Sequence, residues 1–466
     1  MQQRTIDTEV AVVGAGIAGL SAATALVRDG VEAIVLEARD RVGGRVWNTE
    51  IGGEANELGG QWVAPYQSAM HALLAELEIE LFPSFREGEH VYIDPSGRAH
   101  RYEGHDAPLG TASEKAFADA EAKLNALAGE LDPEAPWAHP DARELDAITF
   151  EAWLRSEVPD QVAQDLLRSW LAGGFLAKPP QTFSLLQGLW MIAGAGGTYE
   201  LFEPDQCLAC RVVGGSQLIP IRLAERLGER VLLNAPARDI RWSDDAVEVT
   251  TEATTVRART AIVAVPPNLT TAIRFRPALP AWRQRLGQSL SQGSINKVLA
   301  VYERPFWRDH GLSGQGFAPY ELVRELYDNS PPSASAGVLV TFLAGENAER
   351  AGRLRDADRR AAVLEGMAKY VGPAALEPID FIETDWSAQE WTRGAYGTSF
   401  GVGGLTRFGE DLRRSIGPIH WACTDIAGVG HIHMEGAVRS GERAAQACLE
   451  AAGMETSRSA PRAPPA

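Results

Sequence analysis

Cysteine is scarce in this chain of 466 residues, which contains only four. That number is too small for a scaffold held by disulfides and fits a reducing compartment, so we expect a cytoplasmic protein. Cys207 and Cys210 form a C-x-x-C pair, but a zinc site would need two further ligands at matching spacing. We therefore expect neither a metal site nor a redox motif there.

Basic residues are outnumbered, and long apolar runs are missing. Lysine and arginine total 44 against 62 aspartates and glutamates, which gives a formal net charge of −18. Such a balance argues against nucleic acids and anionic membranes as partners and mildly favours cationic ligands. Without a run of about 18 apolar residues we expect no membrane span, and the short polar lead before Glu9 does not resemble a signal segment.

A glycine-rich turn between a strand and a helix is the clearest motif. The apolar strand Val10–Val13 leads into Gly14-Ala15-Gly16-Ile17-Ala18-Gly19 and a helical run, and a second strand, Ala33–Leu36, ends at Glu37. Free N–H groups at a helix N-terminus bind phosphates, and an acid after the second strand accepts hydrogen bonds from ribose hydroxyls. The arrangement predicts a dinucleotide site.

The residues after this strand indicate which dinucleotide binds. Glu37-Ala38-Arg39-Asp40-Arg41-Val42-Gly43-Gly44-Arg45 resembles the extension of flavoproteins with two dinucleotide-binding domains, in which the glutamate holds the adenosine ribose of FAD. The expected cofactor is therefore FAD. Only one such fingerprint occurs, and without an NADPH site we expect an oxidase or dehydrogenase, not a pyridine-nucleotide monooxygenase.

The order of the expected elements indicates an α/β protein whose FAD-binding domain is interrupted. A helical block runs from Thr111 to Ile192, and Ile295–Tyr302 and Gly337–Leu343 are expected strands of a second, antiparallel sheet. We predict a Rossmann-like FAD fold of the two-dinucleotide-binding-domain type, with an inserted substrate domain of antiparallel sheet plus helices. The predicted parts are an FAD-binding domain at 1–77, 206–276 and 385–453, a substrate domain at 78–205 and 277–384, and a disordered tail at 454–466.

Several separated blocks resemble the flavin amine oxidases, the family that contains monoamine oxidase, polyamine oxidase and L-amino acid oxidase. The blocks follow the family's order to about Ala452 and are Leu58–Pro65, Val213–Ser216, Gly293–Lys297, Pro305–Trp307, Trp386, Gly394–Tyr396, Met434–Val438 and Gly441–Ala445.

The resemblance implies a set of cofactor contacts. Glu37 would bind ribose, Arg39 and Arg45 would lie near the adenosine and pyrophosphate, and backbone N–H groups from Met434 onward would face the flavin. The implied FAD-binding residues are Gly14, Gly16, Ile17, Ala18, Gly19, Glu37, Ala38, Arg39, Gly43, Gly44, Arg45, Gly59, Gly60, Gln61, Trp62, Ala237, Trp386, Asp425, His433 and Met434.

The resemblance also implies three catalytic residues, Lys297, Tyr396 and His433. In the family the lysine holds a water against flavin N5 and supports the reaction with oxygen; the alternative is a lysine that reaches outward from an edge strand. Tyr396 aligns with one wall of the aromatic cage around the substrate amine. His433 stands at the second wall, where relatives have tyrosine or tryptophan, and could stack, hydrogen-bond or act as a base. For His431 a structural role is expected, because two histidines alone do not complete a metal site.

Other departures from the family pattern bear on how FAD is bound and on which class of substrate is expected. Covalent monoamine oxidases use a cysteine directly before the cage tyrosine, whereas this chain has Ala395, so FAD should be bound non-covalently. Cys423 replaces a glycine and Asp425 a glutamate on the phosphate side. L-amino acid oxidases need an arginine, often in a loop that here offers Gln61 and Trp62, so an amine fits better than an amino acid.

The resemblance as a whole implies an FAD-dependent oxidase of a primary or secondary amine. Hydride would pass from the C–N carbon to flavin N5, the imine would hydrolyse to a carbonyl compound, and oxygen would become hydrogen peroxide. Trp62, Phe175, Phe202 and Tyr396 favour an aromatic or heteroaromatic amine, although core packing would also explain both phenylalanines. His433 is a further implied substrate contact, and its departure from the family pattern weakens a simple monoamine-oxidase assignment. A polyamine would need carboxylates along its tunnel, and none can be placed from the sequence. The alternatives are an L-amino acid oxidase, a C–C desaturase or isomerase, and a non-enzymatic interaction module; a homodimer is left open.

Overall fold

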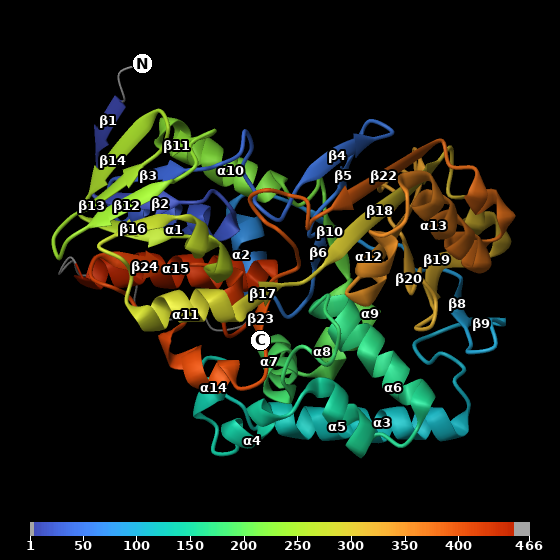
Figure 1. Cartoon of the computed structure of the whole chain (residues 1–466). Helices are drawn as coiled ribbons and strands as arrows, with labels where there is room; N and C mark the ends of the chain where they lie inside the picture. Colours follow the sequence, from blue (N-terminus) through green and yellow to red (C-terminus); the bar gives the residue numbers. More distant parts are fainter. Residues whose placement is uncertain (1–3, 452–466) are drawn as a thin grey trace.

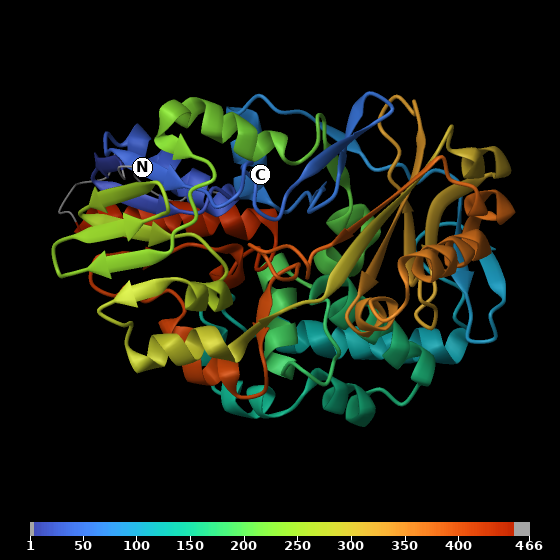
Figure 2. The ribbon, with the colours of Figure 1, turned by 45° about the horizontal axis from the view of Figure 1, so that its top comes forward.

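The computed structural model describes residues 4–451, which form three large sheets and a layer of helices. In Figure 1 two sheets with N-terminal strands lie on one side, the longest sheet lies on the other, and helices from the blue-green part of the chain run beneath both. Figure 2 also shows the two sheet regions apart, with the long red helix α15 beside the strands of the left-hand region. The predicted mixture of helices and sheets is confirmed, and the predicted tail at 454–466 lies outside the described residues.

A parallel five-stranded sheet carries the glycine-rich turn. Its strands, in spatial order, are β11 (Val231–Leu232), β3 (Ala33–Leu36), β2 (Val10–Val13), β15 (Thr260–Val263) and β24 (Ile419–Trp421). All four residues of β2 are buried, as expected for a central strand of a parallel sheet. The chain continues from β2 to β3 on one side, whereas β15 pairs on the other side. The carboxyl end of β2 is therefore a topological switch point, where open α/β sheets bind their ligands.

Helices with small residues pack beside this sheet. They are α1 (Ile17–Arg28), α2 (Ser68–Glu76), α10 (Leu218–Leu227) and α15 (Met434–Ala451). Helix α15 crosses α1 so closely that a Cβ added to Gly441 would lie 2.2 Å from the carbonyl oxygen of Ala18. A second five-stranded sheet lies next to this group and consists of β1 (Arg4–Asp7), β14 (Thr254–Ala258), β13 (Val247–Thr250), β12 (Asp239–Trp242) and β16 (Arg274–Arg276).

The third sheet has seven strands and contains the expected strand at Ile295–Tyr302. Its spatial order is β22 (Asp380–Asp385), β18 (Ile295–Tyr302), β21 (Gly337–Ala344), β20 (Glu325–Asp328), β19 (Leu312–Phe317), β8 (Glu89–Ile93) and β9 (Ala99–Tyr102). Its pairs are antiparallel except for β19 with β8. β18 is fully buried between β22 and β21 and is not an edge strand. Helices α12 (Glu346–Ala351) and α13 (Asp356–Val371) belong to this half of the molecule.

The helical layer is longer than the sequence predicts. It comprises α3 (Thr111–Gly129), α4 (Ala142–Ala147), α5 (Phe150–Glu157), α6 (Gln161–Leu167), a π-helix (Arg168–Phe175), α7 (Leu185–Ala195), α8 (Thr198–Phe202) and α9 (Pro204–Cys207). The last two helices lie beyond Ile192, the expected end of the helical block. They have five and four residues, which is too short for an apolar periodicity to be recognised.

Short elements connect these layers. They are β4 (Asn48–Ile51) with β5 (Glu54–Glu57), β6 (Trp62–Val63) with β10 (Cys210–Val212) and β7 (Leu81–Pro83), β17 (Leu290–Gln292) with β23 (Thr398–Phe400), α11 (Ala281–Ser289) and α14 (Gly404–Phe408). In the described part of the chain, none of the helices has both the length and the apolar character that crossing a bilayer requires.

Candidate functional site

A cavity of about 260 Å³ extends from the glycine-rich turn to the seven-stranded sheet. Many of the implied site residues lie on its wall, although they come from distant parts of the sequence: Gly14, Gly16, Ile17, Ala18, Glu37, Ala38, Arg39, Gly43, Gly44, Arg45, Gly59, Gly60, Ala237, Lys297, Trp386, Tyr396, His433 and Met434. The wall does not include Gly19, Gln61, Trp62, Phe175, Phe202 or Asp425.

The N-terminus of α1 forms one end of the cavity. Gly16 is the N-cap of this helix and no side chain caps its N–H groups. A Cβ added to Gly16 would have no neighbour closer than 4.0 Å, so the glycine borders open space. By contrast, a Cβ on Gly14 would lie 2.7 Å from the carbonyl oxygen of Ala264, and the φ of Gly14 is +105°. Uncapped N–H groups beside open space fit a pyrophosphate.

Glu37 is held in place next to this helix terminus. Its two carboxylate oxygens accept hydrogen bonds from the backbone N–H groups of Ala15, at 2.7 Å, and Arg39, at 2.9 Å. The side chain is buried yet lines the cavity, as a ribose-binding acid must. The guanidinium of Arg39 donates to the Thr392 hydroxyl and also faces the cavity. These contacts fit the adenosine half of FAD.

Arg45 and Asp425 form a buried ion pair in the middle of the site. An Arg45 nitrogen lies 2.5 Å from the Asp425 carboxylate, and its other terminal nitrogen donates to the Tyr396 carbonyl at 2.7 Å. Burial alone would raise the pKa of Asp425, but the Arg45 guanidinium beside it lowers that pKa to about 2. Asp425 also accepts a hydrogen bond from the Thr398 N–H at 2.6 Å. Asp425 thus orients Arg45, which reaches the cavity, while Asp425 stays behind it.

Lys297 is enclosed in the protein and points to the cavity. Its side chain is 3 % exposed, and its Nζ donates to the Gly59 carbonyl at 3.0 Å and to the Gln61 carboxamide. Burial lowers the pKa of Lys297 to about 7. The alternative of an outward-reaching lysine on an edge strand is wrong, because β18 has a partner on each side.

A chain of amides continues behind Lys297. Gln61 donates to the Asn329 side chain at 2.6 Å, and Asn329 donates to the Asn56 side chain at 2.5 Å. Beside it, Arg211 and Glu57 form a buried ion pair at 2.6 Å. Gln61 therefore contacts the lysine instead of the cavity. Asn329 carried no sequence signal, because it lies outside the recognisable motifs.

Tyr396 and His433 line the far end of the cavity together with Phe342. The ring centroids of Phe342 and Tyr396 are 6.2 Å apart, and the ring planes meet at 65° in an edge-type contact. His433 Nδ1 lies 2.9 Å from the His431 carbonyl oxygen, which can only accept, so Nδ1 carries the proton. Burial lowers the pKa of His433, which keeps the ring neutral and leaves Nε2 as an acceptor.

The other proposed substrate contacts lie behind this wall. Phe202 is 4 % exposed and packs against Trp170 and Phe175, whose ring in turn contacts His433 at 6.2 Å. Trp62 packs against Phe342 at 5.8 Å. These rings support the cage from outside the cavity.

His431 lies in the core rather than at the site. Its ring stacks on Trp190 with centroids 3.7 Å apart, and burial lowers its pKa to about 3. The uncharged, stacked ring fits the structural role expected for it.

Glu325 is an acidic residue near the cage that no sequence motif predicted. It lies on β20 and accepts a hydrogen bond from the Tyr327 hydroxyl at 3.0 Å. Burial raises the pKa of Glu325, although its side chain keeps some accessible surface and is not among the residues that line the cavity. Burial raises the pKa of Tyr396, and the negative charge of Glu325 raises it further. A series of ring contacts, from Tyr327 to Trp62, from Trp62 to Phe342 and from Phe342 to Tyr396, connects Tyr327 to the cage.

Among the described residues the Glu325 carboxylate forms no salt bridge, although the positive charge of neighbouring Arg324 lowers its pKa and partly opposes the effect of burial. The Arg324 guanidinium itself donates a hydrogen bond to the Ala344 carbonyl at 2.6 Å. A largely desolvated carboxylate that lacks a salt bridge is costly. Its presence beside the cage points to a cationic ligand.

Comparisons with known proteins agree with this geometry. The sequence model of the family "flavin containing amine oxidoreductase" matches residues 17–449. The chain is 44 % identical to putrescine oxidase from Kocuria rosea over 96 % of both chains, and 35 % identical to L-amino acid dehydrogenase from Synechocystis sp. over 94 % of both. A solved structure of wild-type putrescine oxidase bound to putrescine superposes with a TM-score of 0.94 at 45 % identity, covering 96 % of this chain and 100 % of that one.

Proposed function

Since the chain belongs to the flavin-containing amine oxidoreductases and is an FAD-dependent amine oxidase, we propose that its substrate is a short aliphatic diamine of the putrescine type. The observation that carries this proposal is the enclosed carboxylate of Glu325 beside the cage residue Tyr396. A diamine has one amino group to be oxidised and a second, protonated one to be recognised. A desolvated carboxylate is the natural partner for that second group.

The similarity to putrescine oxidase supports the same substrate class. That relative is similar over nearly its whole length, so the proposal does not depend on a single module. The acidic formal charge of −18 also suits a substrate that arrives as a dication.

The residues at the cage would hold the amine that reacts. The faces of Tyr396 and Phe342 offer π surfaces to the amino group, and the Nε2 lone pair of His433 is available to accept a hydrogen bond from it. A bound flavin supplies the acceptor for a hydride from the carbon next to nitrogen. The imine then leaves the site and is hydrolysed to an aldehyde.

We assign Lys297 to the reaction with oxygen. Its Nζ is fixed by Gly59 and Gln61 at the cavity wall, and oxygen would leave as hydrogen peroxide. Ala395 offers a methyl group where a thiol would be needed for a covalent flavin bond, in keeping with non-covalent FAD. We further propose a cytoplasmic location, in keeping with four cysteines that are all free thiols.

An aromatic amine is the second candidate substrate. Trp62, Phe342 and Tyr396 are in ring contact near the cage and could surround an aromatic side group. An aromatic monoamine would leave the charge of Glu325 unmatched, which is why we rank it second.

Peroxide release from a panel of amines tests the proposal. The purified holoenzyme is incubated in air with putrescine, butylamine, benzylamine and L-leucine, and peroxide is measured with a coupled peroxidase. We expect the highest kcat/KM with putrescine. A higher value with benzylamine would favour the aromatic candidate, and a higher value with L-leucine would favour an amino acid oxidase.

A further inference from the structure

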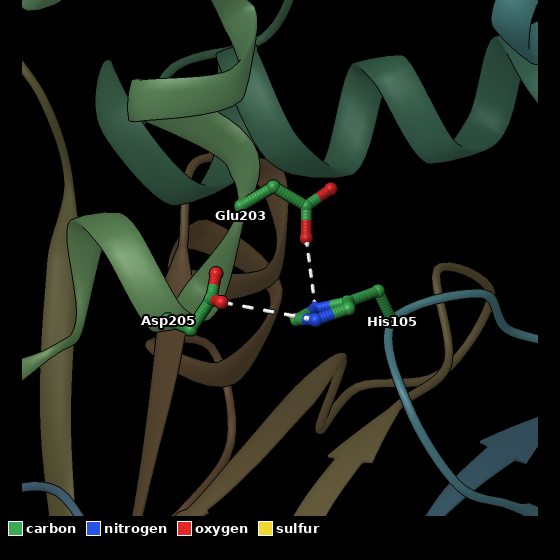
Figure 3. Close-up of side chains that lie close together, drawn as sticks. All are labelled: His105, Glu203 and Asp205. Atoms are coloured by element: carbon green, nitrogen blue, oxygen red, sulfur yellow. Dashed lines mark ion pairs between the residues drawn. The ribbon is translucent and has the colours of Figure 1, made fainter.

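Three potential metal ligands from two separate segments meet at the surface, away from the cavity. His105 lies between β9 and α3, Glu203 connects α8 to α9, and Asp205 belongs to α9. One ligand atom from each lies within 4.8 Å of the other two. In Figure 3 both carboxylates point toward the imidazole, which reaches across from its own loop.

The contacts within this cluster, which we call the His105 cluster, leave its charge poorly matched. The ring nitrogens of His105 lie 3.4 Å from Glu203 and 3.7 Å from Asp205, both longer than a hydrogen bond. The second carboxylate oxygen of Asp205, Oδ1, is buried and has no hydrogen-bond partner among the described residues. Two carboxylates thus share one weakly held imidazole.

Further acids add to the negative charge around Glu203. Burial raises the pKa of Glu203, and Asp205, Glu121 and Asp106 raise it further, against the opposing effect of His105. A cation bound between Glu203 and Asp205 would relieve this repulsion.

We propose that the His105 cluster is a binding site for a divalent transition metal ion of the zinc class. One imidazole and two carboxylates form a ligand set that such ions accept, with water in the remaining positions. The three side chains are 55 %, 24 % and 38 % exposed, so they can rotate to the bond lengths of about 2.0–2.2 Å that zinc requires.

A metal at this site would tie two segments together. The loop before α3 would be fixed to the α8–α9 turn, and α8 ends at Phe202, which packs on Phe175 behind His433. The site would therefore stabilise the outer support of the cage without touching the cavity.

Zinc titration of the holoenzyme tests this proposal. After treatment with a chelator, the wild type is titrated with zinc chloride in a calorimeter and should bind one ion per chain at micromolar concentration. His105→Ala and Glu203→Gln should each weaken binding by roughly tenfold or more, because each removes a ligand. His139→Ala is the matched control, since His139 faces a single carboxylate, that of Glu130, at 3.7 Å.

The outcomes separate this site from others. Zinc should also raise the melting temperature of the wild type and of H139A, but not that of H105A. The proposal is overturned if the wild type binds no zinc below about 100 μM, or if H105A binds as tightly as the wild type, which would place the ion elsewhere.

Discussion

At the scale of single residues, the site is marked by two ionisable groups on the seven-stranded sheet, Lys297 on β18 and Glu325 on β20. Lys297 has polar partners but no acidic one in contact, and Glu325 has a tyrosine hydroxyl. Burial shifts both pKa values toward the uncharged form. Groups with such shifts in a cavity are candidates for function, because stability alone would favour neutral side chains.

Glu325→Gln should distinguish a diamine from a monoamine. Loss of a charge-assisted hydrogen bond should lower kcat/KM for putrescine by roughly 10- to 100-fold. Butylamine has no second ammonium group, so its kcat/KM should change by less than about threefold. Steady-state peroxide assays give both values, with Glu321→Gln, a surface acid paired with Lys369, as the control. Equal losses for both amines would contradict the assignment.

Lys297→Met should change how stability depends on pH. The folded pKa is about 7 against 10.5 for the free side chain, so between these values the unfolded chain binds more protons than the folded one. Wild-type stability relative to the variant should therefore rise with pH, by at most about 1.4 kcal/mol per pH unit from 7 to 10. Denaturant unfolding of the holoenzyme measures this difference, and Lys115→Met on the exposed face of α3 is the control. If the unfolding free energies of the wild type and K297M change with pH in parallel, the pKa of Lys297 is not lowered in the folded protein.

At the scale of elements, the cavity depends on where helices begin and how closely they pack. The glycine-rich turn follows β2 and leads directly into α1. The free N–H groups at the N-terminus of α1 therefore point into the cavity. Helix α15 begins at Met434, which lies on the cavity wall beside His433. The close crossing at Gly441 sets the position of this second helix start.

Gly441→Ala should disturb this crossing. The new Cβ would lie 2.2 Å from a backbone oxygen of α1, so the helices must separate. We expect a loss of roughly 1–3 kcal/mol in unfolding free energy and weaker retention of FAD. Gly129→Ala is the matched control, because that helical position has no atom within 4 Å of an added Cβ. Retained stability and FAD content in G441A would contradict the role given to the crossing.

These elements show how far the sequence alone could lead. Val10–Val13 and Ile295–Tyr302 were predictable with correct ends, because each is an apolar run bounded by turn residues or a motif. The position of Glu325 was not predictable, because β20 has only four residues and their sequence shows no strong apolar pattern. β20 pairs with its chain neighbours β19 and β21, and the contact that connects this part of the sheet to the cage, between Phe342 on β21 and Tyr396, joins separate parts of the chain.

At the scale of the whole molecule, the cavity lies where the three large parts meet. The parallel sheet provides the dinucleotide end, the seven-stranded sheet provides Lys297 and Phe342, and the helical layer supports the cage from outside. Because no single part holds all of these groups, the relative placement of the sheets decides which amine reaches the flavin.

Anaerobic reduction of the bound flavin by putrescine tests the central claim most directly. The holoenzyme is mixed with putrescine or benzylamine without oxygen, and the flavin absorbance is followed in time. We predict complete bleaching, faster with putrescine than with benzylamine, and recovery of the absorbance with peroxide release when air is admitted. A fully loaded flavin that putrescine leaves unbleached would contradict the account.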